Sequence, residues 1–249
     1  MWLNCDLGES FGNWQMGCDA EVMPFIDQAN IACGFHASDP LTMQQTVRLA
    51  LQHGVMLGAH PGYPDLVGFG RRSLACSHAE LVALIRYQVG ALQAIAAAEG
   101  GQVRYVKPHG ALYNDMMAKP EVFRAVLEAV AGLPGELHLL AMAVPDHARF
   151  QQLADELGVP LWWEAFADRA YTPEGRLQPR NQAGAVYHDS SRILQQALDF
   201  ASGQVKTTAG TWLSLPVQSL CVHGDNPESV AVVRGIRQVL KQGQNGAQG

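Results

Sequence analysis

The sequence predicts an α/β fold in a single domain, built from βα units around a parallel sheet. Short apolar runs alternate with longer segments of helical periodicity along the 249 residues, which is typical of strands joined by crossover helices. A chain of this length with 48% hydrophobic residues can bury one large core. The alternation continues without an interdomain linker or a repeat of fixed period. We therefore expect one domain over residues 1–241, followed by a frayed tail over residues 242–249.

Seven short runs, rich in Val, Leu, Ile, Ala and Cys, are the expected strands. Runs of this length and composition are typical of strands buried in a parallel sheet. They are Leu3 to Cys5, Gln28 to Cys33, Val55 to Ala59, Val103 to Val106, Leu137 to Ala141, Leu161 to Glu164 and Ser219 to Val222.

Capping residues mark the starts of helices between these strands. Asp39 places a cap before Pro40 at the first helical position, and Asn226 and Pro227 repeat this arrangement. The segment from Ser77 to Glu80 has the sequence of a capping box, in which each residue satisfies a backbone N–H group of the other.

Two segments interrupt the alternation of strands and helices. Phe166 to Tyr187 is long and rich in Arg, Pro, Gly and Gln, which predicts an ordered loop over a functional site. Thr207 to Pro216 predicts a β-hairpin around Gly210.

Charge and cysteine usage exclude several classes of protein. The net charge is -6 and the 17 Lys and Arg residues are scattered, so we expect no nucleic-acid partner. The five cysteines are odd in number and form no CxxC pair, which argues against a disulfide framework and favours a reducing cytoplasm. No charged leader precedes an apolar run and no window approaches a membrane span. We therefore expect neither a signal peptide nor a membrane partner.

Residues capable of chemistry follow almost every expected strand. In parallel α/β folds the carboxyl ends of the strands meet on one face, where the active site lies. Taken singly, such a residue is more often a helix cap or a turn residue, but their joint placement favours one pocket. In chain order they are Asp6, Glu9, His36, Asp39, His60, His109, Glu164, Asp168, His223 and Asp225.

Three of these residues suggest a metal site. Asp6, His36 and His60 offer one carboxylate and two imidazoles from three strand ends, which could form an open divalent site that activates water. The chain has no HxxxH or HExxH pair that would place two ligands on adjacent helical turns, so the spacing alone does not establish a metal.

The alternative is general acid and base catalysis without a metal. His109 and His223 have side chains that can exchange protons near neutral pH, and Lys107 and Asp225 lie beside them in the sequence.

The run from Gly68 to Arg72 combines flexible backbone with two adjacent guanidinium groups, those of Arg71 and Arg72. Such groups can bind a carboxylate or a phosphate through paired hydrogen bonds. The chain contains no Walker A motif (GxxxxGKS or GxxxxGKT), so it lacks the usual means of holding ATP.

Seven motifs stand in order from one end of the sequence to the other. They are LNCDLGE (3–9), NIACGFH (30–36), GAHPGYP (58–64), GFGRR (68–72), KPHGALY (107–113), EAFADR (164–169) and CVHGD (221–225). Together they resemble the LamB/YcsF family, which contains the A subunits of 5-oxoprolinase. Because the resemblance covers essentially the whole chain, it is far more specific than any single pattern.

The resemblance implies both a fold and an activity. The fold is a (β/α) barrel, commonly seven-stranded and incomplete, similar to that of glycoside hydrolases and polysaccharide deacetylases. This likeness favours Asp6, His36 and His60 as metal ligands. The activity is ATP-dependent cleavage of 5-oxo-L-proline (pyroglutamate) to L-glutamate, performed by a complex with two further 5-oxoprolinase subunits, B and C. ATP, with magnesium, is then a co-substrate held mainly by those partner subunits.

The resemblance suggests roles for the candidate residues. The partner subunits would phosphorylate the lactam oxygen, and this chain would direct water onto the activated species. The expected catalytic residues, which transfer protons or orient water, are Asp6, His109, Glu164, His223 and Asp225. The expected substrate-binding residues are Glu9, Arg71, Arg72, Lys107, Asp168 and Arg169.

Two other functions stay open. One is a metal-dependent deacetylase that acts on an N-acetyl sugar without ATP, and the other is a carbohydrate-binding or regulatory protein with no catalysis. The chain also departs from the family pattern at Ser38, where the family usually has glycine. If this position requires a positive φ, serine strains the loop and leaves His36 and Asp39 in place.

Overall fold

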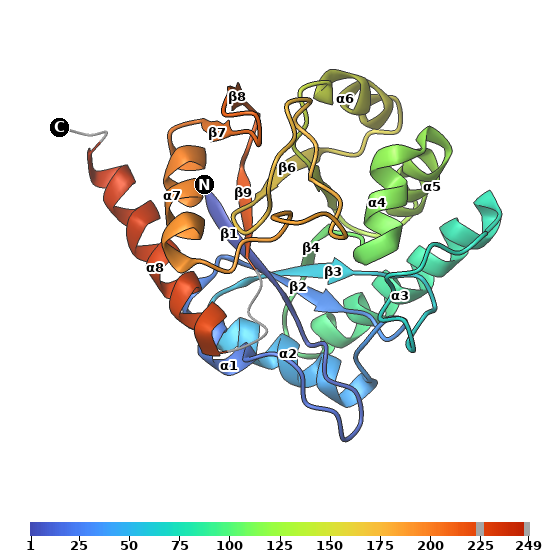
Figure 1. Ribbon diagram of the computed structural model, residues 1–249. Helices are drawn as coiled ribbons and strands as arrows, with labels where there is room; N and C mark the ends of the chain where they lie inside the picture. Colours follow the sequence, from blue (N-terminus) through green and yellow to red (C-terminus); the bar gives the residue numbers. More distant parts are fainter. Residues whose placement is uncertain (223–226, 247–249) are drawn as a thin grey trace.

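The computed structural model describes residues 1–222 and 227–246, and a closed barrel of seven parallel strands lies at its centre (Figure 1). The barrel strands are β1 (Trp2–Leu7), β2 (Gln28–Ala32), β3 (Met56–His60), β4 (Val103–Val106), β5 (His138–Met142), β6 (Leu161–Phe166) and β9 (Ser219–Val222). Strand β9 closes the sheet because Leu220 pairs with Leu3 of β1 on one side and with Ala165 of β6 on the other. The predicted seven-stranded barrel is confirmed, and its ring of strand pairing is complete.

Helices cover the outside of this barrel (Figure 1). They are α1 (Asp19–Val22), the short 3-10 helix η1 (Met23–Phe25), α2 (Pro40–Gln52), α3 (His78–Ala98), α4 (Gly110–Ala118), α5 (Pro120–Ala131), α6 (His147–Glu156), α7 (Ser190–Ala201) and α8 (Pro227–Gly246). Asp39 caps α2 by accepting hydrogen bonds from two backbone N–H groups, and Ser77 and Glu80 form the predicted capping box of α3. Asn226, the expected cap of α8, lies outside the described residues.

The hairpin prediction is confirmed with a shift along the chain. Strands β7 (Gln204–Lys206) and β8 (Trp212–Ser214) pair in antiparallel fashion. Gly210 lies in the turn with a φ of +81°. The first strand precedes the predicted segment because Val205 is buried and anchors the hairpin to the rest of the fold.

The final helix, α8, extends into residues 242–249, which the sequence predicts to be a frayed tail. Helix α8 continues to Gly246, four residues beyond position 242. Val230, Val233, Ile236 and Leu240 are all buried. Their spacing of three and four residues forms one apolar face, and burial of this face stabilises the helix as far as Leu240.

Helix α3 corrects the expectation that no window approaches a membrane span. Its length and hydropathy are sufficient for one. However, Leu81, Ile85, Val89 and Leu92 are buried along one face. Gln88 on the same face exchanges hydrogen bonds of 2.9 Å with the backbone of Gly62. This pattern is typical of a helix packed on a protein core, where alanines raise the mean hydropathy.

The interior of the barrel is filled by polar side chains that hydrogen-bond to one another. Asn4 donates to the hydroxyl of Ser219 at 2.7 Å and accepts from Asn30 at 2.8 Å. Ser219 donates to Gln28 at 2.6 Å, and Tyr105 donates to Asn30 at 2.6 Å. All five residues have an exposed fraction of 0%. Because each is paired, the network avoids the cost of unsatisfied buried groups and forms a rigid floor beneath the strand ends.

Ser38 lies in the strained conformation that its departure from the family pattern suggests. Its φ is +77° and its side chain is fully buried. A left-handed backbone costs about 1–2 kcal/mol for a residue with a Cβ atom, so the loop between β2 and α2 carries local strain. The neighbouring Asp39 still caps α2.

We expect Ser38→Gly to stabilise the protein by up to about 1 kcal/mol, because relief of the left-handed strain exceeds the added entropy of glycine in the unfolded chain. Urea unfolding measures the difference in the free energy of unfolding. Ser38→Ala is the matched control, since it keeps the Cβ atom and should give no gain. A loss of stability in Ser38→Gly would contradict the assignment of strain to this position.

We expect Gly58→Ala in β3 to destabilise the protein by about 1–3 kcal/mol or to prevent folding, because the added Cβ atom would overlap the ring of Tyr105. Gly90→Ala is the control, since no described atom lies within 4 Å of its added Cβ atom in α3. The control should gain about 0.5–1 kcal/mol from helix propensity. Thermal unfolding of the two variants distinguishes overpacking from a general effect of replacing glycine, and equal effects would contradict the close contact at Gly58.

Candidate active site

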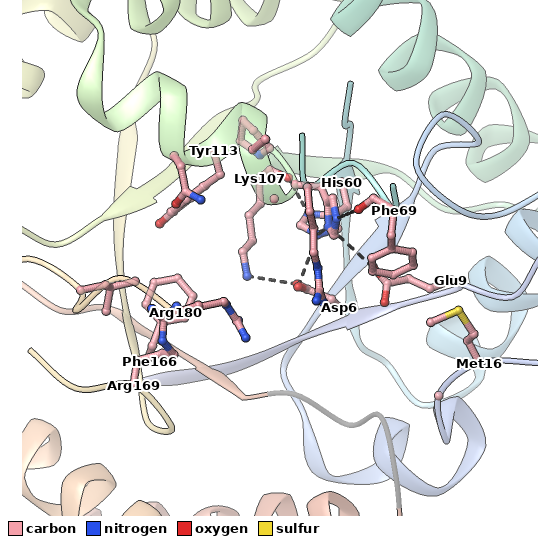
Figure 2. A pocket seen from close by; sticks show the side chains of 18 of the residues that line it. Asp6, Glu9, Met16, His60, Phe69, Lys107, Tyr113, Phe166, Arg169 and Arg180 are labelled. Carbon is pink, nitrogen blue, oxygen red and sulfur yellow. Dashed lines mark hydrogen bonds and ion pairs between the residues drawn. The ribbon is translucent and has the colours of Figure 1, made fainter. Parts of the chain in front are cut away.

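The carboxyl ends of the barrel strands surround a cavity of about 770 Å³ (Figure 2). Its lining includes the acidic residues Asp6 and Glu9, as well as His60 and His109. The cationic residues that line it are Arg71, Lys107, Arg169 and Arg180. Strand ends thus bring together residues from sequence positions 6 to 180, as the parallel fold predicts.

Glu9 and three histidines form one group, which we call the histidine cluster (Glu9, His36, His60 and His109). Glu9 and His36 lie in the loops after β1 and β2, His60 ends β3, and His109 precedes α4. Their metal-ligating atoms all lie within 4.8 Å of one another. The rings of His36 and His109 stack with centroids 3.7 Å apart, and the ring of His60 is perpendicular to both.

Backbone carbonyl groups orient two of these rings. His60 Nδ1 is 2.6 Å from the carbonyl oxygen of Lys107, and His109 Nε2 is 2.8 Å from that of Phe69. Because a carbonyl oxygen only accepts, both nitrogens must donate their protons. The other nitrogens, His60 Nε2 and His109 Nδ1, face each other at 3.0 Å.

Burial disfavours the protonated form of two histidines of this cluster, His36 and His109. Burial and the neighbouring His60 lower the pKa of His109 to about 3, and burial with His109 and His60 holds the pKa of His36 well below its usual range. Neutral imidazoles are the form that binds metal ions. A pKa of about 3 leaves His109 uncharged near pH 7, and its role in proton transfer stays a prediction.

A buried ammonium group joins two carboxylates next to the histidines, and we call this group the lysine cluster (Asp6, Lys107 and Glu164). Lys107 Nζ lies 3.1 Å from Asp6 Oδ1 and 3.2 Å from Glu164 Oε2. It also donates to Asn4 Oδ1 at 3.1 Å. Burial opposes the charge of Lys107, but Asp6, the Cys221 thiol and Glu164 outweigh this and hold its pKa well above the usual range.

Glu164 lies beneath the cavity and does not belong to its described lining. Burial raises the pKa of its carboxyl group, and Lys107 and Tyr113 partly offset the rise. Asp6 is closer to the cavity and connects the two clusters, because its Oδ2 atom lies 3.4 Å from His60 Nε2. Asn30 donates to Asp6 Oδ1 at 2.8 Å and fixes the carboxylate between them.

The two adjacent arginines of the glycine-rich run have different environments. Arg71 lines the cavity. Arg72 instead pairs with the buried carboxylate of Asp65, which also accepts from Gly68 N at 3.0 Å. The hydrogen bonds from Arg72 lower the pKa of Asp65 to about 2. Arg72 therefore shapes the loop and does not belong to the described lining of the cavity, so its role in substrate binding stays a prediction.

The loop from Phe166 to Tyr187 forms one wall of the cavity, as predicted. Arg169 lines the cavity and holds the loop together, because it donates to the carbonyl oxygens of Gln178 at 2.7 Å and Ala185 at 3.2 Å. Arg180 projects from the same loop toward the cavity (Figure 2). Asp168 lies outside the described lining, and its backbone carbonyl accepts from Tyr187 N.

The structure thus brings together most of the predicted site residues. Those that line the cavity are Asp6, Glu9, His60, Arg71, Lys107, His109 and Arg169. His36 is buried within the histidine cluster. His223 and Asp225 lie outside the described residues. Of the three predicted metal ligands, His36 and His60 lie together and share their cluster with Glu9 and His109. The third, Asp6, accepts hydrogen bonds from Lys107 and Asn30 and is not part of this cluster.

Sequence reasoning missed Asn4, Asn30, Tyr113 and Phe69. Asn4 and Asn30 lie inside expected strands and precede the strand ends, so a search for residues after strands passes over them. Their signal is the period of two. Asn4 and Asp6 in β1 both point to the barrel interior, as do Tyr105 in β4 and Lys107 directly after it. Phe69 contributes through its backbone carbonyl, which no residue type reveals.

Comparisons with known proteins agree with this fold along the full chain. The model of the LamB/YcsF family matches residues 1–248. The chain is 61% identical to a protein of Pseudomonas putida named as the second A subunit of 5-oxoprolinase, over 96% of its length and 93% of that protein. It is also 61% identical to the 5-oxoprolinase A subunit of Chromohalobacter salexigens, with 96% of each chain covered.

Among solved structures, the lactam utilization protein from Thermus thermophilus superposes with a TM-score of 0.90 and 40% identity, over 97% of this chain and 96% of that one. A putative cellobiose-phosphate cleavage protein from Enterococcus faecalis superposes with a TM-score of 0.56 at 9% identity, over 97% and 94% of the two chains. The second likeness shows a shared fold alone.

We expect Lys107→Met to destabilise the protein by about 3–5 kcal/mol near pH 7, because it leaves the buried carboxylate of Glu164 and the partly buried carboxylate of Asp6 without their cation. When the pKa of a carboxyl group is higher in the folded state than in the unfolded state, the protein's free energy of unfolding falls as the pH rises through that higher pKa. The pKa of Glu164 is raised already, so the variant should be less impaired near pH 5 than near pH 8.

The double variant Lys107→Met with Glu164→Gln tests this account, since it removes the buried charge and should recover part of the lost stability. Urea unfolding across this pH range gives the free energies. Equal destabilisation at both pH values, with no recovery in the double variant, would contradict the electrostatic role of the lysine cluster.

Proposed function

The chain belongs to the LamB/YcsF family, and we propose that it is the A component of an ATP-dependent 5-oxoprolinase, which opens the lactam ring of 5-oxoproline to give glutamate. The names of its relatives support this activity over a deacetylase or a non-catalytic binding protein. The observation that carries the proposal is the cavity, whose lining combines the ammonium group of Lys107 and the carboxylates of Asp6 and Glu9 with three arginines.

The charges of the cavity suit this substrate. 5-Oxoproline has one carboxylate and a neutral five-membered lactam. Arg71, Arg169 and Arg180 line the cavity wall, and guanidinium groups bind carboxylate or phosphoryl oxygens through paired hydrogen bonds. The volume of about 770 Å³ exceeds the needs of the lactam and leaves room for a phosphoryl group on its oxygen.

The chemistry requires activation before water can open the ring. An unstrained lactam is a poor electrophile, and transfer of the γ-phosphoryl group of ATP to its oxygen makes the ring carbon reactive. Water then adds to that carbon, the C–N bond breaks as the nitrogen takes a proton, and a second water releases phosphate from the resulting acyl phosphate. The products are glutamate, ADP and phosphate.

The described residues fit the water-addition part of this sequence. Asp6 lies at the base of the cavity and is oriented by Lys107 and Asn30, so it can orient the attacking water and accept its proton. Lys107 lines the cavity beside Asp6 and can stabilise the negative charge of the phosphoryl group on the lactam oxygen. Glu164 acts through Lys107, as a positioning residue beneath it.

We assign the phosphoryl transfer to partner subunits, designated B and C, that hold ATP with magnesium. The chain has no Walker A motif for this purpose, and relatives that are named as one lettered component of 5-oxoprolinase support the existence of others. None of the five cysteines forms a disulfide bond in the described structure, which supports a cytoplasmic location for the complex.

The test is release of glutamate from 5-oxoproline by the purified chain, alone and mixed with the B and C components, with and without ATP. We expect turnover only in the full mixture with ATP, with one phosphate released per glutamate. Turnover of an N-acetyl sugar by the chain alone would favour a deacetylase, and no turnover in any mixture would overturn the proposal.

A matched pair of variants tests the site. Asp6→Asn keeps the shape of the side chain but removes its basicity, and we expect glutamate formation in the reconstituted complex to fall by about 10²–10⁴-fold. Asp155→Asn, on the exposed face of α6, should retain full activity. Circular dichroism checks that both variants are folded. Full activity in Asp6→Asn would exclude Asp6 from the reaction.

A further inference from the structure

We propose that the histidine cluster (Glu9, His36, His60 and His109) is a binding site for one divalent transition-metal ion, with Zn²⁺ the best match to its donors. Three imidazoles and one carboxylate are a ligand set that suits Zn²⁺. The four residues come from four separate segments of the chain, yet their ligand atoms lie within 4.8 Å of one another. Binding of the ion is a property of this chain itself and is independent of the reaction assigned to it.

The orientation of two rings is the first argument. His60 Nδ1 and His109 Nε2 donate their protons to the carbonyl oxygens of Lys107 and Phe69. In neutral rings, His60 Nε2 and His109 Nδ1 therefore both carry lone pairs, and they face each other at 3.0 Å. Two lone pairs at this distance repel unless a cation lies between or beside them. Metal-binding histidines characteristically donate their outer N–H group to a backbone carbonyl in this way.

The spacing of the donor atoms is the second argument. Ligand atoms on a tetrahedral ion with bonds of about 2.0–2.1 Å are separated by about 3.3 Å. His36 Nε2 lies 3.3 Å from Glu9 Oε1, and His109 Nδ1 lies 3.7 Å from the same oxygen. These distances resemble the edges of a coordination shell, and only small side-chain movements are needed to close it.

The surroundings hold the ligands in place and favour a cation. His36 is fully buried, its ring stacks on that of His109, and its Nδ1 atom has no hydrogen-bond partner among the described residues. Gly70 packs against both rings, because a Cβ atom there would lie 2.7 Å from His36 Cβ and 2.8 Å from His109 Cδ2. The carboxylate of Asp6 lies 3.4 Å from His60 Nε2 and adds negative charge beside the site.

One side of the site faces the cavity. Glu9, His60 and His109 line it, whereas His36 closes the site from behind. A bound divalent ion would supply Lewis acidity there, polarising a carbonyl oxygen or lowering the pKa of water. The ligands would be Glu9, His36, His60 and His109, and Asp6 would remain beside the ion, held by Lys107.

The experiment uses the full chain without partners, ATP or substrate. The purified protein is dialysed against a chelator, the chelator is removed, and ZnCl₂ or CoCl₂ is added during calorimetric titration. We expect one ion per chain, a higher Tm in its presence, and for Co²⁺ the visible absorption of a four-coordinate site. Elemental analysis before dialysis reports the ion that the protein carries when isolated.

Substitutions locate the ion. We expect His109→Ala and Glu9→Gln each to weaken Zn²⁺ binding by at least about 100-fold and to abolish the rise in Tm. His78→Ala is the matched control, because His78 also pairs with a glutamate, Glu128, but on the exposed surface, and it should bind Zn²⁺ like the original chain. Glu9→Gln is nearly isosteric and keeps the test informative if His109→Ala does not fold.

Two results would overturn the inference. One is the absence of stoichiometric binding to the folded chain, which would leave a shared proton between His60 and His109 as the cation. The other is binding of unchanged affinity in both His109→Ala and Glu9→Gln. Because neither measurement involves turnover, loss of this inference and loss of the proposed activity are distinguishable.

Discussion

The ammonium group of Lys107 is the interaction on which the rest of the site depends. It is buried within the barrel and neutralises Asp6 and Glu164, whose strands lie on opposite sides of β9. The backbone carbonyl of the same residue orients His60. One residue therefore sets the charge of the lysine cluster and the tautomer of a member of the histidine cluster. A buried ion pair of this kind adds little to the free energy of unfolding, because the cost of desolvating the charges offsets much of their attraction. Its main effect is to fix the orientation of the two carboxylates.

The barrel floor makes that position rigid. The side chains of Asn4 and Asn30 hydrogen-bond to the lysine cluster above them and to Ser219 and Tyr105 beside them. Below this layer, the ring of Trp162 stacks on His138 with centroids 3.9 Å apart and contacts Trp2. A paired polar layer above an aromatic layer leaves each acidic group a narrow range of orientations, which is the arrangement that electrostatic catalysis requires.

The loop between β3 and α3 packs against the histidine cluster and orients one of its rings. Arg72 and Asp65 close this loop, and its strained residue Phe69, with a φ of +53°, presents the carbonyl oxygen that accepts from His109. Strain in this loop and at Ser38 flanks the histidine cluster on two sides. Such strained backbone is commonly retained where it orients functional groups.

The sequence by itself determined the parallel α/β architecture, the seven strands and the family. These follow from local physics: apolar runs are buried as strands, and capping residues such as Asp39 and Ser77 satisfy the first backbone N–H groups of the helices that follow them. The sequence also showed that most of the candidate site residues directly follow the strands. Within each strand, the alternation that places Asn4 and Asp6 inside the barrel was present in the residues, but its meaning depended on closure of the sheet.

Only the tertiary structure decided which residues meet. Arg71 and Arg72 are adjacent and chemically identical, yet one lines the cavity and the other pairs with Asp65. His109 joins His60 and Glu9, although the sequence grouped His60 with Asp6 and assigned His109 to proton transfer. The reason is physical: residue type determines what a side chain can bind, whereas long-range register and burial determine what lies within about 3 Å of it.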